Sequence, residues 1–471
     1  MYQGIITRSA AVFLLATLCP AAYAFGVEFP DDDGEGVIRS AAMDVTDEFI
    51  KQLGSASKET QFEFSLFDDV SFVADTERVE TTEDGFSWIG KIAKEDVGDV
   101  ILSVVDGDLA GTVWVDTQIY NIHGDGDGGY TVDEIDSTAL ELAHDADTSP
   151  SQPNRRTLPS FLLSRPRVVD RLLAREEGYK RLRGRIQGLV TAGLLPDFIL
   201  SFIPESGARV DVLLVTTPSA EEWMETNGHH RTATINNLIE KANTALRESL
   251  IDSQLNLVGL EFVDYDPVDP ELLTDLGNLA DPPIHADLQF LHTRRDELRA
   301  DIVSLLVHQS NPVNAGRGKT LRMLPAVTVT PPDGKGQFEE KGFNVVDIKY
   351  AVRENAFTHE IGHNYGSQHD RFQFEIEKAE VAPQFVPSIP GAHGFILPEV
   401  NVRTVMAYDT FCQETFGFSC SRIPRFSNPD QFHHGVRRGV ALGLPISADN
   451  ASMFNLTARV VANYRHALVQ P

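Results

Sequence analysis

The sequence predicts two folded parts, an antiparallel β domain over residues 25–150 and an α/β domain over residues 207–471. With 471 residues, the chain is too long for one ordinary domain. In the first part, short runs of alternating apolar residues are separated by turn residues, which is typical of antiparallel strands. In the second part, strand-length and helix-length patterns alternate, which is typical of an α/β domain.

Residues 1–24 are expected to form a signal peptide. Arg8 precedes the apolar residues 10–18, and Ala22-Tyr23-Ala24 fits a signal-peptidase site with cleavage after Ala24. A membrane anchor fits less well, because spanning a bilayer takes about 20 apolar residues. A lipoprotein site at Cys19 is disfavoured, because Leu18 stands where a small residue is needed. We therefore expect a protein that is secreted to the exterior, or is periplasmic in transit, and that has no membrane partner.

Residues 25–150 are expected to form an acidic β-rich domain, with 31 acidic and 6 basic residues. The strand-like runs are residues 62–67, 86–92, 100–105, 111–115 and 118–122. Residues 125–129 predict a glycine-rich hairpin turn, because Gly129 stands where a calcium loop needs its third oxygen ligand. Calcium dependence stays unknown.

Residues 151–206 are expected to be a basic linker that contains the processing sites, with 10 basic and 5 acidic residues. Helical spacing over residues 168–182 allows a helix within this linker. No domain has the strongly basic surface that neutralises phosphates, so the charge pattern excludes nucleic acid as a partner.

In residues 207–471, strands are predicted at 210–215, 255–263, 301–307 and 343–350, and helices at 231–252 and 288–298. After removal of the signal peptide, the chain keeps two cysteines, Cys412 and Cys420. An even number of cysteines in an exported protein favours a disulfide over two free thiols.

The main chemical motif is H-E-I-G-H at residues 359–363, followed by His369. On a helix, His359 and His363 lie on one face and can bind a single ion. Three imidazoles leave one zinc position for a water molecule, and Glu360 beside them can act as its general base. Gly366 can adopt the left-handed conformation that ends the helix and turns the chain back, which brings His369 to the metal.

Residues 359–369, together with Met406 in the segment 404–408, resemble the metzincin zinc endopeptidases. Asp370, residues 422–429 and the N-terminal β segment are most similar to bacterial secreted reprolysin-like and peptidyl-Asp metallopeptidases. The active-site resemblance covers about residues 207–468. It implies an α/β (α+β) catalytic domain with a mixed sheet, one catalytic Zn²⁺ and protein or peptide substrates. It also implies that Met406 forms an apolar floor under the imidazoles and that Asp370 is structural.

Two further roles are suggested by the resemblance. Tyr408 matches a position where astacins and serralysins carry a tyrosine near the zinc, so it is either a transition-state hydrogen-bond donor or a packing residue. The wall of the primed-side pocket follows Met406 in this clan. The candidates for it are Arg422, Ile423, Pro424, Arg425 and Phe426. A guanidinium facing this pocket would favour acidic residues after the scissile bond, whereas arginines that make local contacts would not.

The acidic β domain is expected to act as an inhibitory propeptide that covers the cleft and makes the protein a zymogen. Residues 25–150 contain no cysteine, so inhibition by a cysteine bound to zinc is excluded. The alternative is a permanent accessory domain. A binding protein with a structural metal centre is also possible, although such a site fills its fourth zinc position with a protein ligand.

Overall fold

The structure is a computed structural model and describes residues 36–82, 84–125, 128–140, 143–147, 208–310, 312–321, 339–380, 391–442, 444 and 446–465. The predicted signal peptide and the basic linker with its predicted helix lie outside the described residues. No helix among the described residues is long and apolar enough to cross a membrane.

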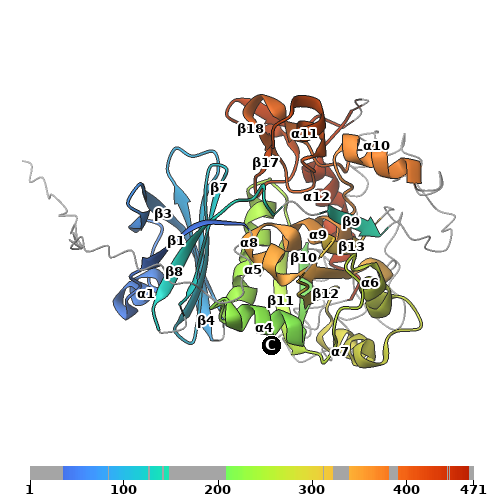
Figure 1. Cartoon of the computed structure of the whole chain (residues 1–471), viewed down its shortest axis with the longest axis horizontal. Helices are drawn as coiled ribbons and strands as arrows, with labels where there is room; N and C mark the ends of the chain where they lie inside the picture. The colour runs from blue at the N-terminus through green and yellow to red at the C-terminus, as the bar shows by residue number, and fades with distance from the viewer. Residues whose placement is uncertain are drawn as a thin grey trace, which may run out of the picture. The chain divides into compact units, whose positions relative to one another are not determined.

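The N-terminal part is an eight-stranded sheet whose neighbouring strands are all antiparallel (Figure 1). Its strand order is β1-β8-β7-β6-β5-β4-β3-β2. The strands are β1 (Val37–Met43), β2 (Gln61–Phe67), β3 (Val70–Thr81), β4 (Gly85–Ile92), β5 (Gly98–Val105), β6 (Asp108–Val115), β7 (Gln118–Gly124) and β8 (Tyr130–Ile135). All five strands predicted here are confirmed, and so is the hairpin at Gly129, which joins β7 to β8.

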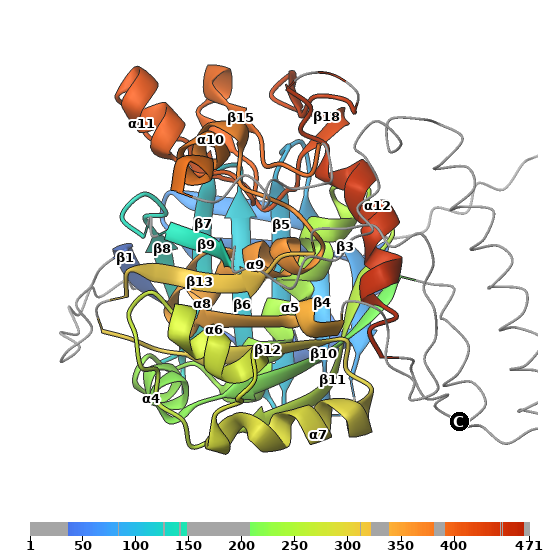
Figure 2. The same cartoon turned by 90° about the vertical axis from the view of Figure 1, so that its right-hand side faces the viewer.

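The second part is built on a mixed six-stranded sheet of order β11-β10-β12-β14-β13-β9 (Figure 2). The strands β11, β10, β12 and β14 are parallel, β13 is antiparallel to β14, and β9 is parallel to β13. The strands are β9 (Ala143–Asp147), β10 (Arg209–Thr216), β11 (Gln254–Phe262), β12 (Ile302–Val307), β13 (Asn314–Lys319) and β14 (Phe343–Asp347). The mixed sheet implied by the resemblance is therefore present.

Helices accompany both sheets, and counterparts of the predicted helices 231–252 and 288–298 are among them. They are α1 (Asp47–Gly54), α4 (Pro218–Thr226), α5 (Arg231–Arg247), α6 (Leu273–Ala280), α7 (Gln289–Leu298), α8 (Ile348–Arg353), α9 (Ala356–Asn364), α10 (Arg371–Glu380), α11 (Thr410–Phe416) and α12 (Asn450–Val461). The predicted strand 343–350 is wrong at its end. The side chain of Asp347 accepts a hydrogen bond from the Lys349 N–H and caps α8, so β14 ends at Asp347, three residues before the predicted end of the strand.

Five short strands complete the described part of the C-terminal region. They are β15 (Ile396–Leu397), β16 (Val402–Arg403) and β17 (Ser421–Arg422), which form one small sheet, and β18 (Asn428–His433) with β19 (Val436–Arg438), which form a hairpin. This region follows the predicted metal-binding segment and carries Met406 and the proposed pocket residues.

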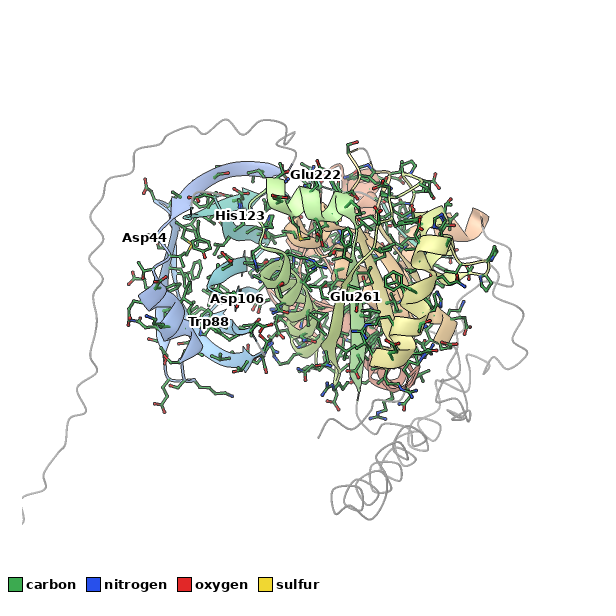
Figure 3. The ribbon with its side chains drawn as sticks, turned by 90° about the horizontal axis from the view of Figure 1, so that it is seen from below. Asp44, Trp88, Asp106, His123, Glu222 and Glu261 are labelled. Carbon is green, nitrogen blue, oxygen red and sulfur yellow. A yellow bond between two sulfur atoms is a disulfide. The ribbon has the colours of Figure 1, made fainter. Side chains whose placement is uncertain are left out.

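Both faces of the N-terminal sheet are buried at its middle strands, whereas β2 at its edge has one exposed face. One face forms its own core around Trp88, which is labelled in Figure 3 and whose indole N–H donates to Thr76 Oγ1 at 3.0 Å. The other face, including Ile101 and Trp114, belongs to the same apolar core as α5 and α9. This explains why β5 is buried along its whole length instead of alternating between core and solvent.

Polar contacts also join the N-terminal sheet to α5. Asn237, in α5, donates from Nδ2 to the backbone carbonyl of Ile101 at 3.0 Å, and its Oδ1 accepts from Thr112 at 2.7 Å. Arg425 Nη1 lies 2.7 Å from Asp99 Oδ2 in β5, and both side chains are almost fully buried. The sheet therefore packs on α5 and on the segment after Met406 through apolar and charged contacts.

Candidate metal centre

Helix α9 carries the first two predicted metal ligands, and both imidazoles are held by backbone carbonyls. His359 Nδ1 lies 2.8 Å from the Val405 carbonyl oxygen, and His363 Nδ1 lies 2.9 Å from the Ser367 carbonyl oxygen. A carbonyl only accepts, so each Nδ1 must carry the proton and each Nε2 keeps its lone pair. The backbone thus fixes the tautomer that binds a metal through Nε2.

The three Nε2 atoms converge. His363 Nε2 lies 3.1 Å from the Nε2 atoms of both His359 and His369, and the three side chains are fully buried. Two neutral imidazoles that both present lone pairs at this distance repel each other unless a cation lies between them. The arrangement fits one zinc ion with three nitrogen ligands.

The third histidine is positioned by the turn that follows α9. Gly366 has φ of +102° and its N–H donates to the His363 carbonyl, while the Ser367 N–H donates to the Gly362 carbonyl. A φ in this range strains any residue with a Cβ, so the predicted glycine stop is confirmed. His393, which the sequence did not indicate, lies under the turn with Nδ1 2.9 Å from the His369 carbonyl oxygen.

Asp370 links the metal-binding turn to the methionine segment. Its Oδ2 accepts from the Tyr408 N–H at 2.9 Å, and its Oδ1 accepts from the Phe372 and Gln373 N–H groups at the start of α10. The structural role expected for Asp370 agrees with these contacts. The ring of Tyr408 packs edge-on against His369, with centroids 4.5 Å apart, which supports the packing role for the ring.

Met406 lies directly against α9 at Gly362. A Cβ atom on Gly362 would lie only 2.3 Å from Met406 Sδ, and Met406 is fully buried. The glycine within H-E-I-G-H therefore lets the methionine approach the helix that carries two ligands, in agreement with the floor expected for Met406.

Gly362→Ala is expected to lower both stability and zinc affinity, because the added methyl group must displace Met406. Overpacking of this kind costs about 1–3 kcal/mol. Gly277→Ala is the matched control, because a Cβ at this position in α6 meets no atom within 4 Å. It should stabilise the helix by about 0.5–1 kcal/mol. Urea unfolding and zinc titration of both variants measure the effect, and equal behaviour of the two would contradict the close contact.

Strand β13 crosses over Glu360 with two glycines that the sequence analysis did not single out. A Cβ on Gly316 would lie 2.7 Å from Glu360 Oε1, and one on Gly318 would lie 2.8 Å from Glu360 Oε2. Only glycine lets this backbone pass so close to a buried carboxylate. The strand therefore borders the carboxylate of Glu360 directly.

Asn364, next to His363, fixes α9 against the sheet. Its Nδ2 lies 2.9–3.0 Å from the carbonyl oxygens of Lys319, Lys341 and Phe343, and its Oδ1 accepts from Asn344. The sequence indicates this residue only through its position next to His363. A buried amide at this position can form hydrogen bonds with several backbone carbonyls.

The residues proposed to line a primed-side pocket lie in the interior. Ile423 and Phe426 belong to the main apolar core, and Pro424 is buried. Arg422 Nη1 pairs with Glu354 Oε2 at 2.8 Å, and Arg425 pairs with Asp99. Both guanidinium groups therefore make buried ion pairs inside the protein. This arrangement does not support the expectation that they face a pocket and bind acidic substrate residues.

The predicted disulfide between Cys412 and Cys420 is present. It joins α11 to the chain before β17, and the Cys420 N–H donates to Asp409 Oδ1 at 2.6 Å. The disulfide thus closes the loop that follows Tyr408.

Part of the chain is similar in sequence to known metallopeptidases. Residues 206–415 match Reprolysin_5, described as metallo-peptidase family M12. Over 261 residues the chain is 26% identical to a peptidyl-Asp metalloendopeptidase of Pseudomonas aeruginosa, covering 54% of this chain and 40% of that protein. The chain thus spans less than half the length of this curated relative.

Two solved structures are also similar, at lower levels. One is a chaperone–substrate complex, with 19% identity, a TM-score of 0.39, and coverage of 55% of this chain and 39% of the other. The second is metalloproteinase-II from Bacteroides fragilis, with 9% identity, a TM-score of 0.37, and coverage of 74% and 90%.

Proposed function

We propose that the whole chain works as a secreted, zinc-dependent endopeptidase, because residues 206–415 match the model of metallo-peptidase family M12. The observation that carries this proposal is the convergence of three imidazoles beside Glu360, two of which have their tautomer fixed by backbone carbonyls. Protein or peptide chains are the proposed substrates, and export follows from the predicted signal peptide at residues 1–24.

In peptide hydrolysis, some residues of this chain would bind the metal and another would transfer protons. When bound by His359, His363 and His369, zinc would supply a Lewis acid that makes water a better nucleophile at neutral pH. Glu360 would accept a proton from the attacking water and deliver it to the nitrogen of the leaving amine. Its burial against β13 keeps the carboxylate in one orientation.

Zinc removal is expected to abolish cleavage of a proteome-derived peptide library by the purified, processed protein. Adding Zn²⁺ back should restore it, because backbone carbonyls already hold the imidazoles of His359 and His363 in place. The same library tests specificity. Enrichment of Asp or Glu after the cut would support the acidic preference suggested by the relative's name, and its source would have to lie outside Arg422 and Arg425. No cleavage by a zinc-loaded, processed sample would contradict the endopeptidase proposal.

For latency, we propose that strand β9 is the inhibitory element. β9 pairs in parallel with β13, from Ala143 opposite Asn314 to Asp147 opposite Lys319, and it lies beside α9 (Figure 2). An extended substrate would bind by adding a strand to this same edge of the sheet. β9 would therefore block the edge that borders Glu360 until the chain is cut in residues 151–206.

The eight-stranded sheet is proposed to remain in the active enzyme. It packs on α5 and shares the main core with the peptidase domain, so its loss would expose Ile101, Trp114 and their partners. This supports the permanent accessory domain over a pro-domain that covers the cleft. Processing would then give two chains that stay together.

Ala146→Pro is expected to raise the activity of the uncut precursor. Proline lacks the N–H needed for a strand ladder, and Ala146 lies opposite Gly318. Peptide cleavage by this variant and by the parent precursor measures the effect, and the same change with Glu360→Gln controls for contaminating proteases. Mass spectrometry of the active parent should find one chain that starts in residues 151–206. A fully active, uncut chain that runs from Phe25 would contradict latency.

A further inference from the structure

A second cluster of metal-binding side chains lies where the N-terminal sheet meets the β18–β19 hairpin. One ligand atom each from Asp96, His433 and His434 lie within 4.8 Å of one another. Asp96 precedes β5, whereas His433 ends β18 and His434 follows it with φ of +46°. Asp116, in the turn between β6 and β7, borders the same cluster.

His433 is the unusual member of this cluster. Its side chain is only 1% exposed, yet neither ring nitrogen makes a hydrogen bond within the part of the chain that the structure describes. The nearest carboxylate atom, Asp116 Oδ1, lies 3.5 Å from Nε2. Leaving a buried polar group without a hydrogen bond costs about 1–3 kcal/mol. A metal ion bound to one of its nitrogens would remove much of that cost.

The contacts of His434 match those of a histidine ligand. Its Nε2 lies 2.9 Å from Asp116 Oδ1, and its Nδ1 lies 3.6 Å from Asp96 Oδ2. A proton on Nε2 that is donated to Asp116 leaves the Nδ1 lone pair directed to the Asp96 side. Metal-bound histidines commonly donate their second ring N–H to a carboxylate in this way. The backbone N–H of His434 also donates to Asp96.

The spacing agrees with that of the catalytic ligands in the same structure. There, neighbouring Nε2 atoms are 3.1 Å apart, and ligand atoms about 2.1 Å from a tetrahedral ion are separated by about 3.4 Å. In the second cluster, the separation of 3.6 Å between His434 Nδ1 and Asp96 Oδ2 lies close to this value.

We propose that Asp96, His433 and His434 bind a second divalent transition-metal ion, with Asp116 orienting His434. Two imidazoles and a carboxylate are ligands that zinc accepts, and they leave one position for water. The ion would connect the loop before β5 to the β18–β19 hairpin. It would hold the N-terminal sheet on the peptidase domain and take no part in peptide hydrolysis.

The test measures zinc bound per chain in the full-length protein, by equilibrium dialysis against Zn²⁺ followed by elemental analysis. The parent is expected to bind two ions, and His434→Ala one, with peptide cleavage unchanged after processing. His434 is half-exposed, so its loss should leave the fold intact. Asp96→Asn provides a second variant with the same expected loss. His285→Ala is the control, because this histidine is similarly exposed and pairs with Asp287 outside the cluster.

The proposal would be overturned by a parent that binds a single zinc ion, or by a His434→Ala variant that still binds two. Loss of the second ion in His285→Ala as well would also overturn it. Failure of peptide cleavage in the parent would contradict the proposed endopeptidase function. It would not change the number of zinc ions bound per chain, which tests the second site.

Discussion

Glu360→Gln is expected to lower kcat by roughly 10²–10⁴-fold, the usual contribution of a positioned general acid or base. Glutamine keeps the size of the side chain beneath Gly316 and Gly318, so β13 can stay in place. It cannot accept the proton from water at neutral pH. KM should change little, because a general base at Glu360 would contact the reacting atoms and other residues would bind most of the substrate backbone.

Three measurements separate this chemical effect from a structural one. Zinc content should remain at the parent value, because the three imidazoles are the proposed ligands and Glu360 is not one of them. Thermal unfolding should also be close to that of the parent. His363→Ala is the contrasting variant and should lose zinc and activity together. A Glu360→Gln enzyme that keeps more than a tenth of the parent kcat would show that another residue is the base.

The proposed metal-binding motif could be predicted from the sequence because its residues are close together in the chain. His359 and His363 are one helical turn apart, and Gly366 determines where the chain must turn to bring His369 back. Met406 was found through the family resemblance. Its contact with Gly362 depends on tertiary packing that no local pattern encodes.

The parts that could not be predicted depend on contacts between distant segments. Strand β13 has the sequence Asn-Ala-Gly-Arg-Gly-Lys, which has low strand propensity. It is a strand because it pairs with β14 and β9, and its glycines let it pass close to Glu360. Likewise, Arg422 and Arg425 resemble surface residues in sequence. Their acidic partners, Glu354 and Asp99, lie 68 and 326 positions away.

Asp99→Asn is expected to destabilise the protein by about 3–5 kcal/mol, because it leaves the guanidinium of Arg425 buried without its charged partner. Arg425 Nη1 lies 2.7 Å from Asp99 Oδ2, and Lys91 Nζ also contacts the carboxylate of Asp99. Chemical denaturation measures the loss. In a processed two-chain enzyme, the same variant should release the N-terminal sheet on gel filtration.

The same ion pair predicts how stability depends on pH. Burial acts to raise the pKa of Asp99, but the positive charges of Arg425 and Lys91 outweigh it and lower the pKa to about 2. The unfolded value is about 3.9. A carboxyl with a lowered folded pKa stabilises the fold above its unfolded pKa, and this contribution is lost as pH falls from about 4 toward 2. Asp99→Asn should therefore remove part of the acid dependence of unfolding.

Replacing both partners distinguishes an unpaired charge from a loss of packing. Asp99→Met with Arg425→Met removes both charges, and well-packed apolar residues in place of a buried ion pair are often neutral or stabilising. The double variant should therefore be more stable than Asp99→Asn and should keep the N-terminal sheet bound. Asp69→Asn, which breaks the exposed pair with Arg39, should change stability little. If the double variant is as unstable as Asp99→Asn, then the shape of these two side chains matters more than their charge, and the N-terminal sheet is held chiefly by packing around Ile101 and Trp114.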